Sequence, residues 1–136
     1  MDINALNKSL AGVADKINKI NGLEYDSEEY DQEEEELHNM EDELMDKYGD
    51  YLEEAFDEVH DEYCPDTDVL LPIAYLAKEY IKNDDGSYDV LYNQGVPVEI
   101  DDYPGKETKL ALVPSPTRII LQIDENNREE VWVASN

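Results

Sequence analysis

Two histidines of the chain each follow an acidic residue by three positions, in Glu35-x-x-His38 and Asp57-x-x-His60. On a helix this spacing places a carboxylate and an imidazole on one face, as in di-iron carboxylate bundles. Both pairs here fall within residues 24–68, which contain 22 acids, so an acid before a histidine is expected by chance. We expect surface histidines and assign no metal site and no cofactor. An enzyme or metal-binding protein using carboxylates with His38 or His60 stays an alternative.

The single cysteine, Cys64, follows His60 by four residues and would reach it on a helix. A Cys–His pair needs a favoured thiolate, whereas the surrounding acids raise a thiol pKa. The chain has no Gly-x-x-x-x-Gly-Lys phosphate loop and no Gly-x-Ser-x-Gly nucleophile elbow. The acidic turns at 83–86 and 124–127 lack the ligand spacing of an EF-hand. We therefore assign no catalytic residue and expect a non-catalytic protein.

Negative charge dominates the sequence. The 136 residues contain 36 Asp and Glu against 10 Lys and Arg, which gives a net charge of −26. Residues 24–68 alone carry −21, whereas residues 1–23 carry +1 and residues 69–136 carry −6. Such a chain repels phosphates, so we expect no direct binding to nucleic acid.

No segment predicts insertion into a membrane or secretion. The longest apolar stretch, residues 69–77, spans nine residues and contains Pro72, whereas a membrane helix needs about 20 apolar residues. The N-terminus lacks a basic stretch followed by an apolar run. We expect a cytoplasmic protein.

The acidic segment predicts binding to a basic protein surface. Residues 28–63 carry 18 acids and one lysine. As a helix they would present about one negative charge per 3 Å of axis, close to the roughly 3.4 Å spacing along a B-DNA strand. The sharper hypothesis is therefore a nucleic-acid mimic or inhibitor that covers a basic cleft. The alternative is an acidic face without a specific partner.

The acids expected to act collectively on the partner are Glu33, Glu34, Glu35, Glu36, Glu41, Asp42, Glu43, Asp46 and Asp50. Tyr25 and Tyr30 lie in the same stretch and are candidates for contact, because tyrosine is enriched at interfaces.

Two helical patterns determine the geometry of this surface. Residues 2–21 have Asp2 as N-cap and an apolar face of Ile3, Leu6, Leu10, Val13, Ile17 and Ile20. Residues 28–63 have Ser27 as N-cap and an apolar stripe of Leu37, Met40, Leu44, Tyr48, Tyr51, Ala55, Val59 and Tyr63. Gly49 favours a break or kink, so this element is one bent helix or two.

The second half of the chain predicts strands. Residues 68–82 fit either a helix, which their apolar spacing favours, or a buried strand. From residue 80 onward the apolar residues alternate, and turn residues separate the segments. The predicted strands lie near residues 88–92, 96–100, 109–113, 117–123 and 130–134. Short turns between successive strands indicate antiparallel pairing.

These elements predict an α+β fold, with two or three N-terminal helices packed on one face of a C-terminal antiparallel sheet of about four or five strands. Residues 1–136 would form a single domain, with an acidic helical part at 2–65 and a mainly β part at 68–136. The apolar stripe of residues 28–63 should face the first helix and the sheet, and its acidic face should lie in water. A homo-oligomer remains an alternative, because the apolar face of residues 3–20 could pack against a second copy.

Overall fold

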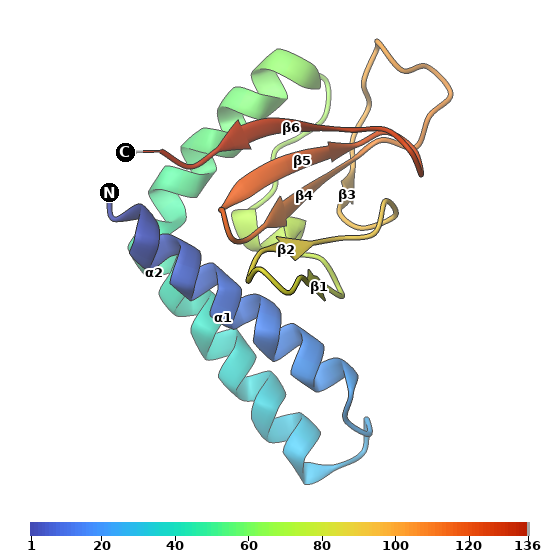
Figure 1. Cartoon of the computed structure of the whole chain (residues 1–136). Helices are drawn as coiled ribbons and strands as arrows, with labels where there is room; N and C mark the ends of the chain where they lie inside the picture. Colours follow the sequence, from blue (N-terminus) through green and yellow to red (C-terminus); the bar gives the residue numbers. More distant parts are fainter. Residues whose placement is uncertain (136) are drawn as a thin grey trace.

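Two long helices precede a small and a larger antiparallel sheet in the computed structural model shown in Figure 1, which describes residues 1–135. The helices are α1 (Ile3–Asn21), α2 (Glu28–Tyr63) and the 3₁₀ turn η1 (Pro72–Tyr75). The strands are β1 (Ile81–Lys82), β2 (Tyr88–Asp89), β3 (Val96–Pro97), β4 (Lys109–Val113), β5 (Arg118–Gln122) and β6 (Arg128–Val133). The predicted α+β fold is confirmed.

The larger sheet has the strand order β3-β4-β5-β6, and β1 pairs with β2 in a separate hairpin. All pairs are antiparallel, and β4 and β5 are aligned from Lys109 opposite Gln122 to Val113 opposite Arg118. The predicted strands at 109–113 and 117–123 correspond closely to β4 and β5, whereas β2 and β3 are only two residues long. The long central strands therefore form the platform on which the helices pack.

Both faces of this sheet are covered, which explains why all five residues of β5 are buried. On one face, Leu112 and Ile119 pack in a cluster with Phe56 of α2. On the other face, Ala111, Val113 and Ile120 pack with the hairpin residues Tyr80, Tyr88 and Val90 and with Ala14 of α1. Helix α1 contributes Leu6 and Leu10 to the first cluster as well, so its apolar face packs within the chain.

Helix α2 is one continuous helix of 36 residues, so of the two predicted alternatives the pair of separate helices is wrong and the single helix is confirmed. Figure 1 shows that the helix changes direction in its middle, between a part that lies alongside α1 and a part that runs toward the sheet. Gly49 is buried, and an added Cβ there would meet only the mobile end of Met45. In the described part of the chain, neither α2 nor another helix is long and apolar enough to cross a membrane.

The predicted apolar stripe of α2 contributes to the buried face of the helix, and that face is wider in the second half than the stripe. Leu44, Ala55 and Val59 are buried as expected, but the fully buried side chains also include Leu52 and Phe56, which lie off that stripe. The second half of α2 needs this wider buried face because it packs in the cluster that contains the sheet residues Leu112 and Ile119.

Residues 68–82 do not form the favoured helix. Leu71 has an extended backbone (φ −62°, ψ 145°), and only the four residues of η1 follow it in a 3₁₀ turn. A proline disfavours the helical conformation of the preceding residue and donates no backbone hydrogen bond, so Pro72 opposes a helix that begins at Asp68 and continues through it. Leu70 and Leu71 are exposed, and the first strand of the chain, β1, begins only at Ile81.

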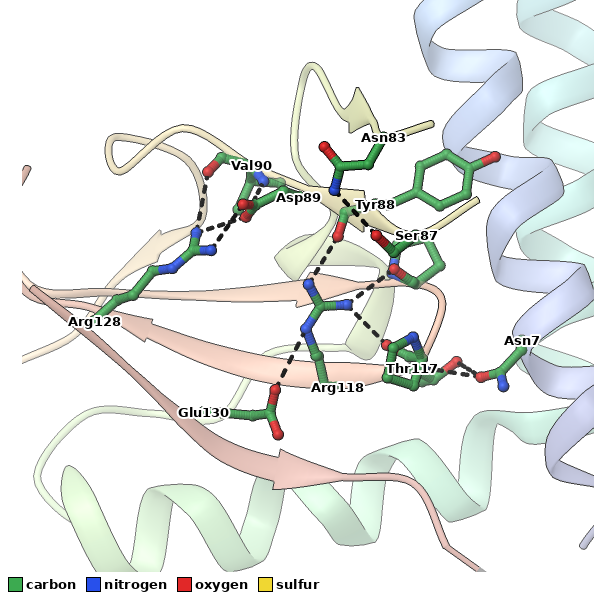
Figure 2. Close-up of polar contacts among 12 residues, drawn as sticks. Asn7, Asn83, Ser87, Tyr88, Asp89, Val90, Thr117, Arg118, Arg128 and Glu130 are labelled. Atoms are coloured by element: carbon green, nitrogen blue, oxygen red, sulfur yellow. Dashed lines mark hydrogen bonds and ion pairs between the residues drawn. The ribbon is translucent and has the colours of Figure 1, made fainter. Parts of the chain in front are cut away.

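Arg118 of β5 connects the larger sheet to the β1–β2 hairpin through hydrogen bonds (Figure 2). Arg118 is 9% exposed, and its guanidinium donates hydrogen bonds to the carbonyl oxygens of Pro114 and Pro116 in the β4–β5 turn. It also donates to the carbonyl of Tyr88 in β2 at 2.7 Å, and Glu130 lies 3.6 Å from its Nε. Burial lowers the pKa of Arg118.

A second arginine reinforces the same junction. Arg128 donates two hydrogen bonds to the Asp89 carboxylate, at 2.6 and 2.8 Å (Figure 2). Burial is the largest single influence on the pKa of Asp89 and acts to raise it. The hydrogen bonds from Arg128 and the Val90 N–H, together with the charges of Arg128 and Arg118, outweigh burial, so the pKa is lowered. Both arginines of the chain are therefore held in contacts within the fold, and they offset little of the charge on α2.

Candidate functional site

One face of α2 carries a line of exposed carboxylates. Eight acids follow one another at intervals of three, four or seven residues, a spacing that keeps side chains on one helical face. All eight are exposed, and within residues 1–135 none of them forms an ion pair. We call these residues the acidic stripe: Glu28, Asp31, Glu35, Asp42, Asp46, Asp50, Asp57 and Asp61.

The structure divides the nine predicted partner-binding acids into two groups. Four of them lie on the acidic stripe: Glu35, Asp42, Asp46 and Asp50. The other five are half-buried, paired with a lysine of the chain, or both: Glu33, Glu34, Glu36, Glu41 and Glu43. Fewer than half of the predicted acids are thus free to meet a partner on one face.

Glu33 holds α1 against α2. Its carboxylate accepts hydrogen bonds from Lys16 and from Lys19, the latter at 2.8 Å, and Glu36 lies 3.3 Å from Lys16. The hydrogen bonds from Lys16 and Lys19 hold the pKa of Glu33 below its usual range. Lysines of the weakly charged first segment therefore neutralise one side of α2, and the opposite side remains acidic.

Glu34 and Glu41 line a pocket of about 380 Å³ between α1, α2 and the segment of η1. The side chain of Glu41 is only 18% exposed, and the imidazole of His38 lies 3.4 Å from it. Burial raises the pKa of Glu41 more than the charge and hydrogen bond of His38 lower it. We call this cavity the interhelical pocket.

His60 belongs to the core, so the surface position predicted for it is wrong. It is 2% exposed, with Nδ1 3.0 Å from the carbonyl of Thr67 and Nε2 2.8 Å from the hydroxyl of Tyr75. Because a carbonyl only accepts, Nδ1 donates to Thr67, and the Tyr75 hydroxyl donates to Nε2. The Tyr75 ring stacks on Phe56 with centroids 4.0 Å apart. Both imidazole nitrogens are occupied, so neither is free to bind a metal.

The remaining candidates for chemistry are isolated from one another. Cys64 is buried, and burial raises the pKa of its thiol to about 11, opposite to the shift that a reactive thiolate needs. The His38 side chain is 68% exposed and contacts Glu41. Within residues 1–135, no group of three or more His, Cys, Asp or Glu side chains is arranged to hold a metal ion.

Sequence reasoning missed four members of the acidic stripe: Glu28, Asp31, Asp57 and Asp61. The signal was present in the helical spacing of the acids, which continues in both directions from the predicted set. The pairing of Glu33 with α1 carries no such signal, because it depends on how two helices pack.

Protein-family models, curated proteins and solved structures contain no match to the chain.

Proposed function

We propose that the protein is a non-catalytic, strongly acidic interaction protein that binds a basic protein surface through the acidic stripe of α2. The observation that carries the proposal is the set of eight exposed carboxylates on one helical face, none of them paired with a cation in the described residues. The chain pairs Glu33, Glu36 and Glu43 with its own lysines and leaves this face free.

The physical properties of the stripe suit such a partner. From residue 28 to residue 61 it extends over about 50 Å of helix contour. Charges spaced along one face attract a basic surface at long range and accelerate association, and salt screens that attraction. Because the field is distributed, the loss of one carboxylate should weaken binding only slightly.

The more specific form of the proposal is mimicry of a nucleic acid. The stripe alone offers roughly one charge per 7 Å of axis, about half the linear density of one DNA strand, and the exposed acids beside it increase that density. A basic cleft that binds nucleic acid is the surface that this arrangement fits best. Mimicry therefore predicts that duplex DNA and the protein compete for the same partner.

The test is a capture experiment from a lysate of the source cells, with binding at low salt and elution in salt steps. The wild-type protein is compared with a stripe variant that carries Glu35→Gln, Asp42→Asn, Asp46→Asn and Asp50→Asn. A matched control variant carries Asp84→Asn, Asp101→Asn, Asp102→Asn and Glu107→Gln, which removes the same charge from exposed acids outside α2. Duplex DNA is added to one set of samples as a competitor.

We expect one basic protein to elute at a defined salt step from the wild type and the control variant and to be lost with the stripe variant. Release of that protein by DNA would support mimicry. A smear of basic proteins, or equal behaviour of the two variants, would mean that the acidic face has no specific partner. Loss of binding through a single Glu→Gln change would instead favour the alternative based on carboxylates with His38.

A further inference from the structure

The interhelical pocket differs from the rest of the acidic surface because its walls are largely apolar. Ile17 and Ile20 of α1, Leu37 of α2, and Ile73 and Leu76 around η1 form these walls. Their side chains are half-buried or buried, so the pocket is a hollow in the surface and not a gap in the core. An occupant would therefore need a substantial apolar portion.

Two carboxylates stand along one wall of this pocket. Glu34 and Glu41 are seven residues apart on α2, which places them about 10 Å apart along the axis with Leu37 between them. The aromatic ring of Tyr30 lies in the same wall, one turn before Glu34. The pocket thus combines apolar walls, a flat aromatic surface and a negative charge.

The charge of Glu41 is poorly compensated by the chain. Its side chain is largely removed from water, and its one ion-pair contact in residues 1–135 is the exposed imidazole of His38. A partly buried carboxylate gains more from an arriving cation than an exposed carboxylate does, because the surrounding medium screens the attraction less. The raised pKa of Glu41 has the same cause, namely burial.

Resting on the proposed function, we propose that the interhelical pocket receives an arginine side chain of the basic partner, with its methylene groups on the apolar walls and its guanidinium at Glu41. Charge complementarity selects a basic occupant, and the apolar walls select one with a long aliphatic stem. Arginine fits better than lysine, because its planar guanidinium pairs with a carboxylate through two hydrogen bonds, stacks on an aromatic ring and is less strongly hydrated.

Lys78 also lines the pocket. It is exposed, and in the described structure its ammonium forms no ion pair with Glu34 or Glu41. Its charge still repels an incoming guanidinium. Lys78→Gln should therefore raise the affinity for the arginine, whereas it would have no such effect if Lys78 lay outside the binding site.

The experiment measures binding of a fluorescent peptide with five Arg-Gly repeats by anisotropy in about 0.1 M salt. Matched peptides replace each arginine by lysine or by citrulline, which keeps the shape of arginine without its charge. The protein variants are Glu41→Gln, the exposed stripe control Glu35→Gln, and Leu37→Phe, which fills the pocket without changing the charge. Circular dichroism verifies that each variant is folded.

We expect Glu41→Gln and Leu37→Phe to weaken binding of the arginine peptide at least fivefold and Glu35→Gln to weaken it less than twofold. The arginine peptide should bind more tightly than the lysine peptide, and the citrulline peptide should not bind. Equal effects of Glu41→Gln and Glu35→Gln would overturn the pocket and leave the acidic stripe as the binding surface. Failure of the arginine peptide to bind the wild type even at low salt would overturn the proposed function together with the pocket.

Discussion

The two histidines of the chain differ in burial, and this difference predicts opposite responses to mutation. His60→Ala removes both hydrogen bonds of the imidazole, so the carbonyl of Thr67 loses its donor and the O–H of Tyr75 loses its acceptor. A buried polar group left without a partner costs roughly 1–3 kcal/mol, so the free energy of unfolding should fall by about 3 kcal/mol. His38→Ala, at an exposed site, should change it by less than about 0.5 kcal/mol.

Urea denaturation of the two histidine variants measures this difference. A loss of stability in His38→Ala as large as that in His60→Ala would contradict the assignment of the core hydrogen bonds. Isothermal titration with Zn²⁺ tests the same proteins for metal binding. If one of the histidines were a metal ligand, the wild type would bind zinc and the variant that lacks that histidine would not.

Replacing Glu41 should increase the stability of the protein in a pH-dependent way. Its pKa in the folded state lies above the ordinary value of 4.5, so the folded state binds this proton more tightly than the unfolded state. Ionisation of the Glu41 carboxylate therefore lowers the free energy of unfolding as the pH rises from 4.5 through the folded-state pKa. Below pH 4.5 the carboxyl group is protonated in both states, and this loss of stability is absent. Glu41→Gln should be more stable than the wild type at pH 7, with a difference that shrinks toward pH 4.

Thermal unfolding of Glu41→Gln and Glu35→Gln between pH 4 and pH 8 tests this expectation. The two variants lose the same charge, so any relief of general repulsion is common to both. A larger gain for Glu41→Gln at pH 7 is expected from its burial. Identical pH profiles of the two variants would show that burial of Glu41 contributes nothing.

At the scale of elements, two glycines test the path of the backbone. An added Cβ at Gly49 would meet the flexible end of Met45 at 3.2 Å, whereas at Gly95 it would lie 2.4 Å from the carbonyl oxygen of Leu110 at a φ of +116°. Alanine inside a helix is about 0.5–1 kcal/mol more favourable than glycine, so Gly49→Ala should stabilise the protein by about that amount. Gly95→Ala should destabilise it by about 2 kcal/mol or more.

Chemical denaturation provides both values in one experiment. If α2 were two helices separated at Gly49, as its Lys-Tyr-Gly sequence suggests, the alanine would remove a required glycine and lower stability. A gain in Gly49→Ala therefore supports the continuous helix, and a loss would contradict it.

The elements that the sequence predicted well are those with local signals. The side chains of Asp2 and Ser27 accept hydrogen bonds from the backbone of the first turns of α1 and α2, as capping residues do. The short apolar runs at 109–113 and 117–123, bounded by turn residues, located β4 and β5, and such runs suit strands that are covered on both faces. Local patterns therefore recovered the fold class and most element boundaries.

The elements that the sequence did not predict depend on contacts between distant residues. Apolar spacing near Leu70 suggested a helix, but Pro72 disfavours the helical conformation of Leu71, and Leu70 instead donates its backbone N–H to the hydroxyl of Tyr75. The clamp of Arg118 on the hairpin joins residues 30 positions apart. No local pattern reveals such contacts, because they exist only after the sheet has formed.

The candidate site was predictable to the extent that it is a property of one helix. Helical spacing alone places Glu35, Asp42 and Asp46 on one face. The roles of Glu33 and Glu41 depend instead on the helix packed beside them, so the sequence pattern did not distinguish them from acids without a partner in the chain. The interhelical pocket needed three elements in place before it could be recognised.

At the scale of the whole molecule, charge and core are separated. The C-terminal half contains the central strands and both arginines, whereas α2 presents most of the negative charge at one side of the fold. Carboxylates four residues apart on a helix repel one another and destabilise it by about 0.2–0.5 kcal/mol for each pair. The folded protein therefore maintains this face against repulsion, which is consistent with a surface kept for a partner.

That repulsion makes the stability of the whole molecule depend on salt. Five of the seven intervals in the acidic stripe are three or four residues, about 5–6 Å along the axis. These pairs lie within the Debye length of about 10 Å at 0.1 M salt, so added salt screens them progressively. The Tm of the wild type should rise between 20 mM and 500 mM NaCl. The stripe variant removes three neighbouring pairs and should melt about 4 °C higher than the wild type at low salt, with a smaller rise on adding salt.

The control variant separates local repulsion from net charge, because it carries the same total charge as the stripe variant. Its neutralised acids lie in turns outside α2, so its Tm and salt response should stay close to those of the wild type. Equal salt responses in the two variants would mean that the total charge of the molecule, and not its arrangement along α2, determines stability. In that case the acidic stripe would not be a distinct surface, and a partner would be sought instead at the exposed apolar residues beside η1.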